Sequence, residues 1–250
     1  MIITTEYVDI PVGSSSMRVF FAAPKDAGKD HQYPGILFYS DIFQLTGPML
    51  RACARLAGYG YLVAAPEIYH RLEPAGTAIP FDDDGRTRGL DDALKTPVAD
   101  FDTSCRAALD YLKQLPAMAP GKLGAAGFCI GGHLSFRAAL QPDVQATVCY
   151  YGTGIHNGKL GKDEDAGSLE RAGEIEGELL LVWGTLDPHI PEDGRAKIEE
   201  VLSKADVNFS QRFYPAEHAF MRDEGPRYDP KATDSAFADM ITLFRQVFGH

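Results

Sequence analysis

The sequence has no apolar run long enough to cross a membrane, since none of its 250 residues lies in a stretch approaching roughly 18 consecutive apolar residues. It is also short of positive charge, with 24 Lys and Arg against 35 Asp and Glu and a formal net charge of −11. Nucleic acids and anionic membrane surfaces are bound through clustered Lys and Arg, so the composition argues against both as partners. An anionic substrate would need a local cationic site.

Cysteine is scarce and shows no ligand spacing. The four cysteines form no C-x-x-C pair, so no metal site is predicted, and we expect free thiols in a reducing cytoplasm. The first eleven residues carry Glu6 and Asp9 and lack a basic start followed by an apolar block, so we expect no signal peptide. The expected location is cytoplasmic.

Short apolar runs of strand length alternate with helix-compatible segments. Such alternation predicts an α/β fold, a mostly parallel central sheet with helices on both faces, in a single domain spanning residues 1–250. The expected strands are 17–23 (at an edge of the sheet), 34–39, 61–65, 123–126, 145–151, 178–184 and 207–214, and the expected helices are 49–59, 98–115, 133–140, 191–205 and 232–248.

Two polar segments, 66–96 and 152–177, interrupt this alternation. A structureless loop as long as the first is improbable in a compact domain unless it covers a site. We therefore expect residues 66–96 to act as a lid.

The sequence Gly127-Phe128-Cys129-Ile130-Gly131 joins an expected strand to an expected helix. It is a G-x-C-x-G form of the sharp strand-to-helix turn that presents a nucleophile, in which glycines remove side chains that would collide. The following helix N-terminus would stabilise a thiolate. Taken alone, the pentapeptide is equally compatible with a glycine-rich turn around an inert buried cysteine.

The order of three residues along the chain, and their positions after expected strands, favour the catalytic interpretation. Cys129, Asp187 and His218 occur in the order nucleophile, acid, base, which is the order of α/β-hydrolases. Each follows an expected strand, and the carboxyl ends of parallel strands meet at one edge of a sheet, where ligands bind. We expect the three side chains to converge as a catalytic triad.

The chain resembles the dienelactone hydrolase family (carboxymethylenebutenolidase-like) over essentially its whole length. The resemblance lies in 127–132, in Trp183-Gly184-Thr185-Leu186-Asp187-Pro188, in 217–222 and in Ala65-Pro66-Glu67-Ile68-Tyr69. It implies an α/β-hydrolase fold and cofactor-free hydrolysis of a cyclic enol-lactone, such as dienelactone, by a monomer.

The expected chemistry is nucleophilic. The Cys129 thiolate would attack the lactone carbonyl to give a thioester, with His218 moving protons and Asp187 orienting it. The backbone N–H groups of Ile130 and Ile42 would hold the oxyanion.

The resemblance also implies further site residues. Asp41 matches an acidic residue that assists the thiol; the family pattern has Glu there, and Asp is one methylene shorter, so capping of its own loop is the alternative role. Two arginines would bind the substrate carboxylate: Arg222, and one of Arg86 and Arg88, with Arg86 favoured.

Three functions are compatible with these residues. The first is a dienelactone-type lactone hydrolase, and the second is a broader carboxylesterase or thioesterase acting on small acyl substrates. The third, of another class, is a non-catalytic ligand-binding module, which would show a missing or displaced triad member. All three imply a small-molecule partner.

Overall fold

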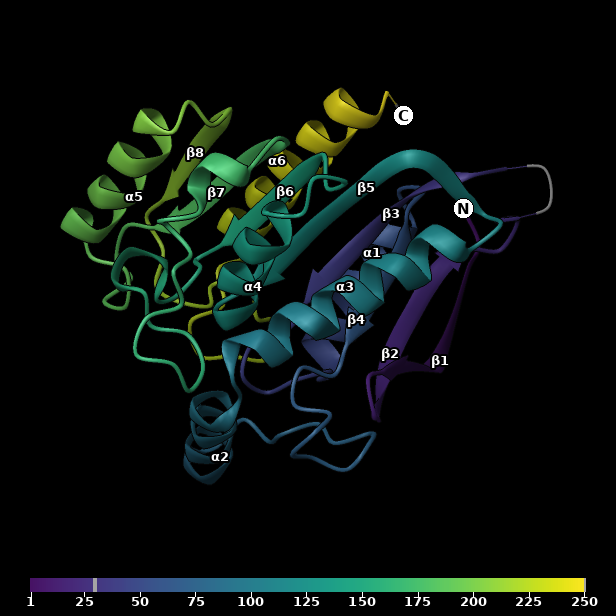
Figure 1. Cartoon of the computed structure of the whole chain (residues 1–250), viewed down its shortest axis with the longest axis horizontal. Coiled ribbons are helices and arrows are strands. Elements are labelled where there is room, and N and C mark those ends of the chain that lie inside the picture. Colours follow the sequence, from purple (N-terminus) through teal and green to yellow (C-terminus); the bar gives the residue numbers. More distant parts are fainter. Residues whose placement is uncertain (29–30, 250) are drawn as a thin grey trace.

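Eight strands form a single sheet in the computed structural model, which describes residues 1–28 and 31–249 (Figure 1). The sheet order is β1-β2-β4-β3-β5-β6-β7-β8. β1 and β2 are antiparallel, and β2 is antiparallel to β4. The remaining neighbours, β4-β3-β5-β6-β7-β8, run parallel to one another, as the alternation predicts. The strands are β1 (Ile3–Val12), β2 (Ser15–Pro24), β3 (Tyr33–Tyr39), β4 (Leu62–Pro66), β5 (Met118–Phe128), β6 (Ala146–Tyr150), β7 (Glu178–Gly184) and β8 (Phe209–Tyr214).

Helices cover both faces of this sheet (Figure 1). α1 (Gly47–Ala57) and α6 (Pro230–Phe248) pack on one face, and α3 (Val98–Gln114) and α4 (Ile130–Ala139) on the other, with α5 (Glu192–Lys204) near β8. Two 3₁₀ turns, Ile155–Asn157 and Ala172–Glu174, interrupt the long connection between β6 and β7.

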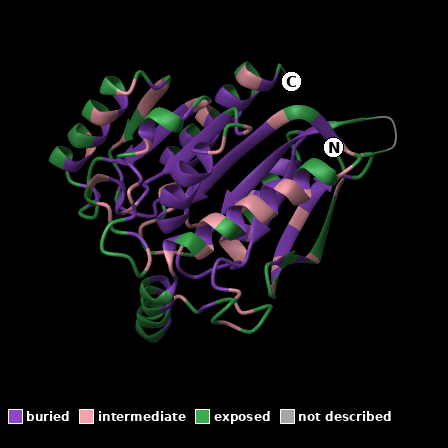
Figure 2. Ribbon diagram, viewed as in Figure 1, coloured by how far each residue is buried: buried purple, intermediate pink, exposed green. Residues whose placement is uncertain are grey.

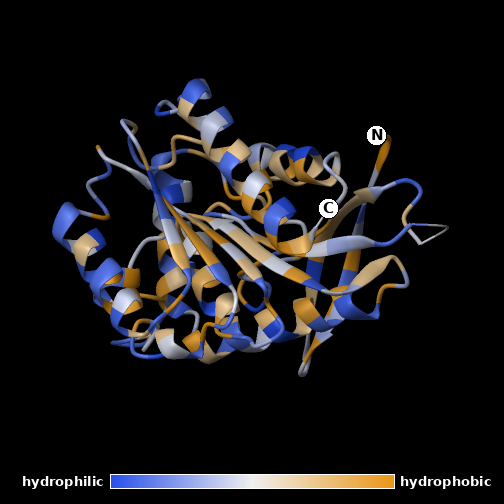
Figure 3. Cartoon of the chain, turned by 90° about the horizontal axis from the view of Figure 1, so that it is seen from above, coloured by the Kyte–Doolittle hydropathy of each residue, from blue (hydrophilic) through white to orange (hydrophobic). Residues whose placement is uncertain are grey.

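The inner strands are buried on both faces, which explains their continuous apolar runs. Every residue of β3, β4 and β6 is buried, and Figure 2 shows the exposed positions mainly on helices, connections and the edge strand β1. Viewed from above, hydrophilic residues gather on the outer turns of the helices (Figure 3). Within the described residues, no helix is both long and apolar enough to cross a membrane.

The edge of the sheet differs from the prediction. The segment 17–23 does form a strand, but β2 lies between β1 and β4, so its expected edge position is wrong. The edge strand beside β2 is β1, which the sequence analysis missed. Its side chains are mostly exposed, so it carries little of the apolar signal that marks a buried strand.

The polar segment 66–96 contains a helix, α2 (Asp83–Lys95), which lies at the lower margin of the molecule in Figure 1. The side chain of Asp82 caps its N-terminus by accepting a hydrogen bond from the backbone N–H of Gly85, at 2.7 Å. A Cβ at Gly89 would lie 2.4 Å from the carbonyl oxygen of Ile42, so glycine allows α2 to rest directly on the loop after β3.

Candidate active site

A cavity of about 760 Å³ is lined by residues from the loops after several parallel strands and from α2. Cys129 and His218 line it, together with the apolar side chains of Leu90 and Leu94 from α2. Among the described residues its walls also carry five cations and two acids: Arg86, Lys159, Lys162, Arg222 and Arg227, against Asp163 and Glu164. The cavity is thus locally cationic in an acidic protein.

The turn after β5 holds Cys129 in a backbone conformation that few non-glycine residues adopt, with φ 60° and ψ −119°. Its neighbours have no room for side chains. A Cβ at Gly127 would lie 2.1 Å from the carbonyl oxygen of Gly131, and one at Gly131 would lie 2.3 Å from that of Ser40. The glycine spacing is therefore a steric requirement of the turn.

Cys129 is anchored through its backbone at the N-terminus of α4. Its N–H donates to the carbonyl oxygen of Tyr150 (3.1 Å), and its own carbonyl oxygen accepts from Thr153 (3.2 Å). The backbone N–H groups of Ile130 and Ile42 form no hydrogen bond within residues 1–28 and 31–249, and both residues line the cavity. Two donors are thus available beside the thiol.

Asp187, after β7, and His218, after β8, form a buried pair. The Nδ1 atom of His218 lies 2.6 Å from Oδ2 of Asp187, and the Asp187 side chain is 1% exposed. The other carboxylate oxygen, Oδ1, accepts the backbone N–H of His189 at 2.8 Å, which fixes the carboxylate in its loop. The ring of Tyr151 packs edge-on against His218, at 5.2 Å between centroids. The imidazole therefore has a defined orientation.

Cys129 also influences the His218 imidazole. Burial is the largest influence on the His218 imidazole and lowers its pKa, but the charge of Cys129 and side-chain hydrogen bonds with Cys129 and Asp187 raise that pKa to about 9. A raised imidazole pKa favours an imidazolium beside a thiolate. The structure thus brings Cys129 and Asp187 to the same imidazole, that of His218.

Asp41 and Arg222 pair with each other, which the sequence analysis did not anticipate. Oδ2 of Asp41 accepts from Nη2 and Nε of Arg222, at 2.6 and 3.1 Å, and Oδ1 caps its own loop by accepting from the N–H of Phe43 at 2.9 Å. No hydrogen bond joins Asp41 to Cys129 among the described residues. The loop-capping alternative is therefore present in the structure, and the thiol-assisting role stays a prediction.

The two lid arginines lie in different surroundings. Arg86 lines the cavity, whereas Arg88 is bound to the carboxylate of Glu73 through Nε (2.6 Å) and Nη2 and does not line it. Of the two arginines that the sequence left competing, only Arg86 lines the cavity.

The family model described as "Dienelactone hydrolase family" matches residues 17–248. The chain belongs to this family. It is 35% identical over 254 residues to a Saccharomyces cerevisiae protein named "Putative carboxymethylenebutenolidase", covering 98% of this chain and 93% of that protein. It is 28% identical to a carboxymethylenebutenolidase of a Pseudomonas species, covering 86% and 85% of the two chains.

Among solved structures, the chain resembles a "Putative Dienelactone Hydrolase" from Klebsiella pneumoniae, with a TM-score of 0.86, 25% identity, and coverage of 98% and 100% of the two chains. The sheet and helices described above are thus the α/β-hydrolase fold of the dienelactone hydrolase family. As a member of this family, the chain is a hydrolase that acts on lactone or ester bonds.

In this dienelactone hydrolase family member, the cavity residues that sequence reasoning missed include His189 and Arg227. The His189 ring lies edge-on against His218, with centroids 4.7 Å apart. Burial and the charges of His218, Arg227 and Arg86 lower the pKa of His189. His189 and Arg227 each lie within five positions of a residue named from the motifs, which is the one signal the sequence offers for these two.

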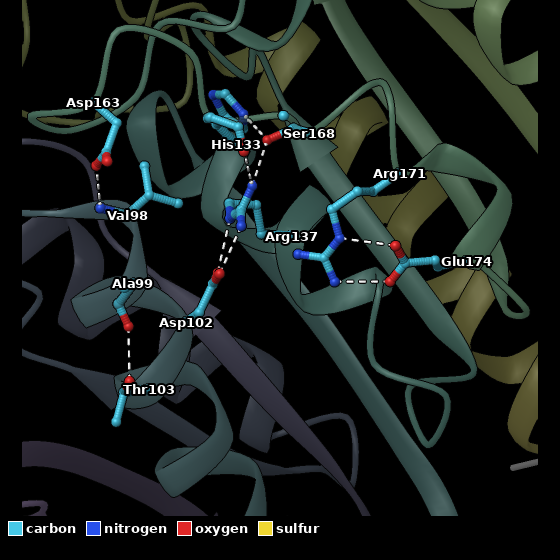
Figure 4. Close-up of polar contacts among 12 residues, drawn as sticks. Val98, Ala99, Asp102, Thr103, His133, Arg137, Asp163, Ser168, Arg171 and Glu174 are labelled. Atoms are coloured by element: carbon cyan, nitrogen blue, oxygen red, sulfur yellow. Dashed lines mark hydrogen bonds and ion pairs between the residues drawn. The ribbon is translucent and has the colours of Figure 1, made fainter.

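A buried polar network supports the cavity wall behind the nucleophile (Figure 4). His133 of α4 contacts Oγ of Ser168 through Nε2 (2.8 Å) and the carbonyl oxygen of Thr153 through Nδ1 (2.9 Å). Arg137, one turn later, donates to Ser168 (2.9 Å) and twice to the carboxylate of Asp102. The network ties the connection between β6 and β7, which forms one cavity wall, to the helix that follows Cys129.

Proposed function

We propose that this protein hydrolyses a carboxylate-bearing lactone or ester, most closely a dienelactone-type enol-lactone, through a Cys-His-Asp triad and a thioester intermediate. The observation that carries the proposal is the His218 ring, which is hydrogen-bonded to Asp187 through Nδ1, interacts with Cys129, and lines a cationic cavity together with that thiol. The proposed reaction uses only side chains, backbone N–H groups and water.

In the first half-reaction, the Cys129 thiolate adds to the ester carbonyl carbon, and the negative charge moves to the carbonyl oxygen. The free N–H groups of Ile130 and Ile42 stabilise that oxyanion. Collapse of the tetrahedral adduct breaks the bond to the ring oxygen, which leaves as an enolate and takes the proton of the His218 imidazolium. An enolate is a good leaving group, so a thiolate is a sufficient nucleophile.

In the second half-reaction, neutral His218 removes a proton from a water molecule, and the resulting hydroxide adds to the thioester carbon. The adduct releases the thiolate and a carboxylic acid, and the imidazolium beside the thiolate is restored. Asp187 keeps the Nδ1 side of His218 occupied throughout, so that Nε2 exchanges protons with the cavity.

Arg86 and Arg222 are proposed to bind the substrate carboxylate, because both line the cavity and a guanidinium makes paired hydrogen bonds with a carboxylate. Asp41 is proposed to assist the thiol. That role requires Cys129 to reach a carboxylate oxygen that already accepts from Phe43 or Arg222.

A second function, hydrolysis of broader ester or thioester substrates, is favoured by the size of the cavity. At about 760 Å³ it lies well within the range of pockets for drug-sized ligands, and the exposed side chains of Leu90 and Leu94 line it. We also propose that the chain works as a single domain in the cytoplasm, supported by its four free cysteines. The monomeric state stays a prediction.

The test is Cys129→Ala, assayed on dienelactone and on p-nitrophenyl acetate. Turnover of both is expected to disappear while the fold is retained, and acid-quenched wild-type protein is expected to carry an acyl group on Cys129 by mass spectrometry. Cys105→Ala, at a buried cysteine away from the cavity, is the matched control and keeps its turnover. Activity retained by Cys129→Ala would place the nucleophile elsewhere, and no turnover of any ester by wild type would favour a binding module.

A further inference from the structure

One face of α2 presents two leucines to the cavity. Leu90 and Leu94 are the large apolar side chains of this otherwise polar helix, and they are neighbours on one face because they lie four positions apart. Both line the cavity although they are 44% and 66% exposed. The exposed leucines Leu72 and Leu186, by contrast, do not line it. The apolar face of α2 is therefore uncovered on the cavity side, where a ligand can cover it.

Two backbone contacts fix the position of this face. Gly89, directly before Leu90, rests against the carbonyl oxygen of Ile42, because an added Cβ would lie 2.4 Å from that oxygen. At the other end of the helix, the carbonyl oxygen of Thr96 accepts a hydrogen bond from the N–H of Lys162, at 2.9 Å. α2 thus reaches from the loop that carries one proposed oxyanion donor to the connection between β6 and β7. Its two leucines are spaced about 6 Å apart along the helix axis.

Further apolar side chains extend this surface on both sides of the helix. The apolar cavity residues of α2, of the loop after β3 and of the β6–β7 connection form what we name the α2 strip: Ile42, Phe43, Leu90, Ala93, Leu94 and Leu160. Leu160 is only 4% exposed and packs in the same apolar cluster as Ile42 and Phe43, so these parts of the strip are held by the core. The strip is therefore a preformed apolar wall of the cavity that contains Cys129.

The proposed reaction leaves this strip to the acyl substituent of the ester. In the tetrahedral adduct the carbonyl oxygen accepts from the N–H groups of Ile42 and Ile130, and the leaving oxygen takes its proton from His218. The remaining substituent on the same carbon is the acyl chain. Since the strip begins at Ile42 and continues along α2, an acyl chain that follows it keeps the carbonyl carbon at Cys129.

We propose that Leu90 and Leu94 are specificity-determining residues, and that the α2 strip binds an apolar acyl chain of the substrate. The proposal rests on the proposed function and deepens its second form, hydrolysis of broader esters, because it names the acyl group that Cys129 receives. A cavity of about 760 Å³ has room for such a chain besides the reacting carbonyl. Each methylene that leaves water for the strip stabilises the bound ester and its transition state.

The experiment measures kcat/KM for p-nitrophenyl acetate, butyrate, hexanoate and octanoate. In wild type, kcat/KM is expected to rise about 2- to 4-fold for each added methylene that reaches the strip. Leu90→Gln and Leu94→Gln keep a side chain of similar length and helix propensity but put an amide in the strip. Each is expected to lower the octanoate-to-acetate ratio of kcat/KM about 10-fold. Because both leucines are exposed, these variants are expected to fold.

Leu72→Gln is the matched control, because Leu72 is 46% exposed and does not line the cavity, and it is expected to keep the wild-type ratio. A second series, alkyl acetates from ethyl to octyl, carries the chain on the leaving alcohol and is expected to show a smaller rise. A flat acyl series in wild type, a rise confined to the alcohol series, or a ratio unchanged in both cavity variants would overturn the inference.

A second copy of the chain is the other occupant that an uncovered leucine face could have. Sedimentation of wild type, Leu90→Gln and Leu94→Gln separates the two, since a substrate subsite predicts the same mass for all three proteins. A wild-type dimer that dissociates in these variants, together with a flat acyl series, would overturn the inference in favour of a contact between copies. Failure of the proposed function is read separately, from turnover of p-nitrophenyl acetate by Cys129→Ala.

Discussion

Replacing Gly131 by alanine tests whether the loop after β3 is held in place by the nucleophile turn. Gly131 lies in the first turn of α4, where alanine is the better helix former by about 1 kcal/mol. The new methyl group, however, would stand 2.3 Å from the carbonyl oxygen of Ser40 and 2.7 Å from that of Tyr39. Both are backbone atoms, so no side-chain rotation relieves the contact.

The size of the effect follows from these distances. Real Cβ contacts essentially never fall below 3.0 Å, so the backbone at Ser40 must withdraw by at least about 0.7 Å from its 2.3 Å position. Ile42, two residues later, supplies one of the two proposed oxyanion donors. A misplacement on the order of 1 Å costs about 100-fold in rate, and complete loss of one donor costs about 100- to 1,000-fold in kcat. We expect kcat to fall about 100-fold and unfolding free energy to fall by about 1–2 kcal/mol, because overpacking outweighs the helix gain.

The assay is steady-state hydrolysis of p-nitrophenyl acetate together with thermal unfolding. Gly173→Ala is the matched control, because a Cβ there meets no atom within 4 Å, and it is expected to behave as wild type. A Gly131→Ala protein whose kcat stays within about 3-fold of wild type would refute the coupling between this contact and the oxyanion donors.

Three further predictions concern buried charges. Folding raises the pKa of His218 from 6.5 to about 9, so the unfolding free energy of the wild type should fall as pH rises across that interval, and that of His218→Gln should fall less. Equal pH dependence of the two unfolding free energies, measured by urea denaturation, would contradict this. Burial lowers the pKa of His133 to about 3, so stability should fall as pH drops from 6.5 toward 3, and His133→Gln should flatten that slope in the same measurement. Arg137→Met, which removes the donor to the partly exposed Asp102 and to the buried oxygens of Ala166 and Ser168, should cost about 2–3 kcal/mol by urea denaturation. Arg171→Met, at a half-exposed pair, should cost under about 1 kcal/mol, and equal costs would be inconsistent with the role of burial.

The expected strands and helices agree with the structure where an element is buried on both sides or strongly amphipathic. β7 spans the predicted 178–184, and α3 begins at the predicted Val98. The exceptions are β1 and α2, whose side chains are mostly exposed. Local sequence patterns report burial, so elements that bury little leave a weak pattern.

The sequence alone determined the nucleophile turn and the placement of Cys129, Asp187 and His218 after the parallel strands β5, β7 and β8. These features depend on short-range sterics and on apolar strands that must pack in parallel, and both are readable from neighbouring residues.

Only the tertiary structure decided how the charged residues around them are paired. Asp41 pairs with Arg222 across 181 positions of sequence, and Arg86 and Arg227 line the same cavity from distant segments of the chain. A long charged side chain can reach any of several partners, and which one it meets depends on how loops and helices settle against the finished sheet.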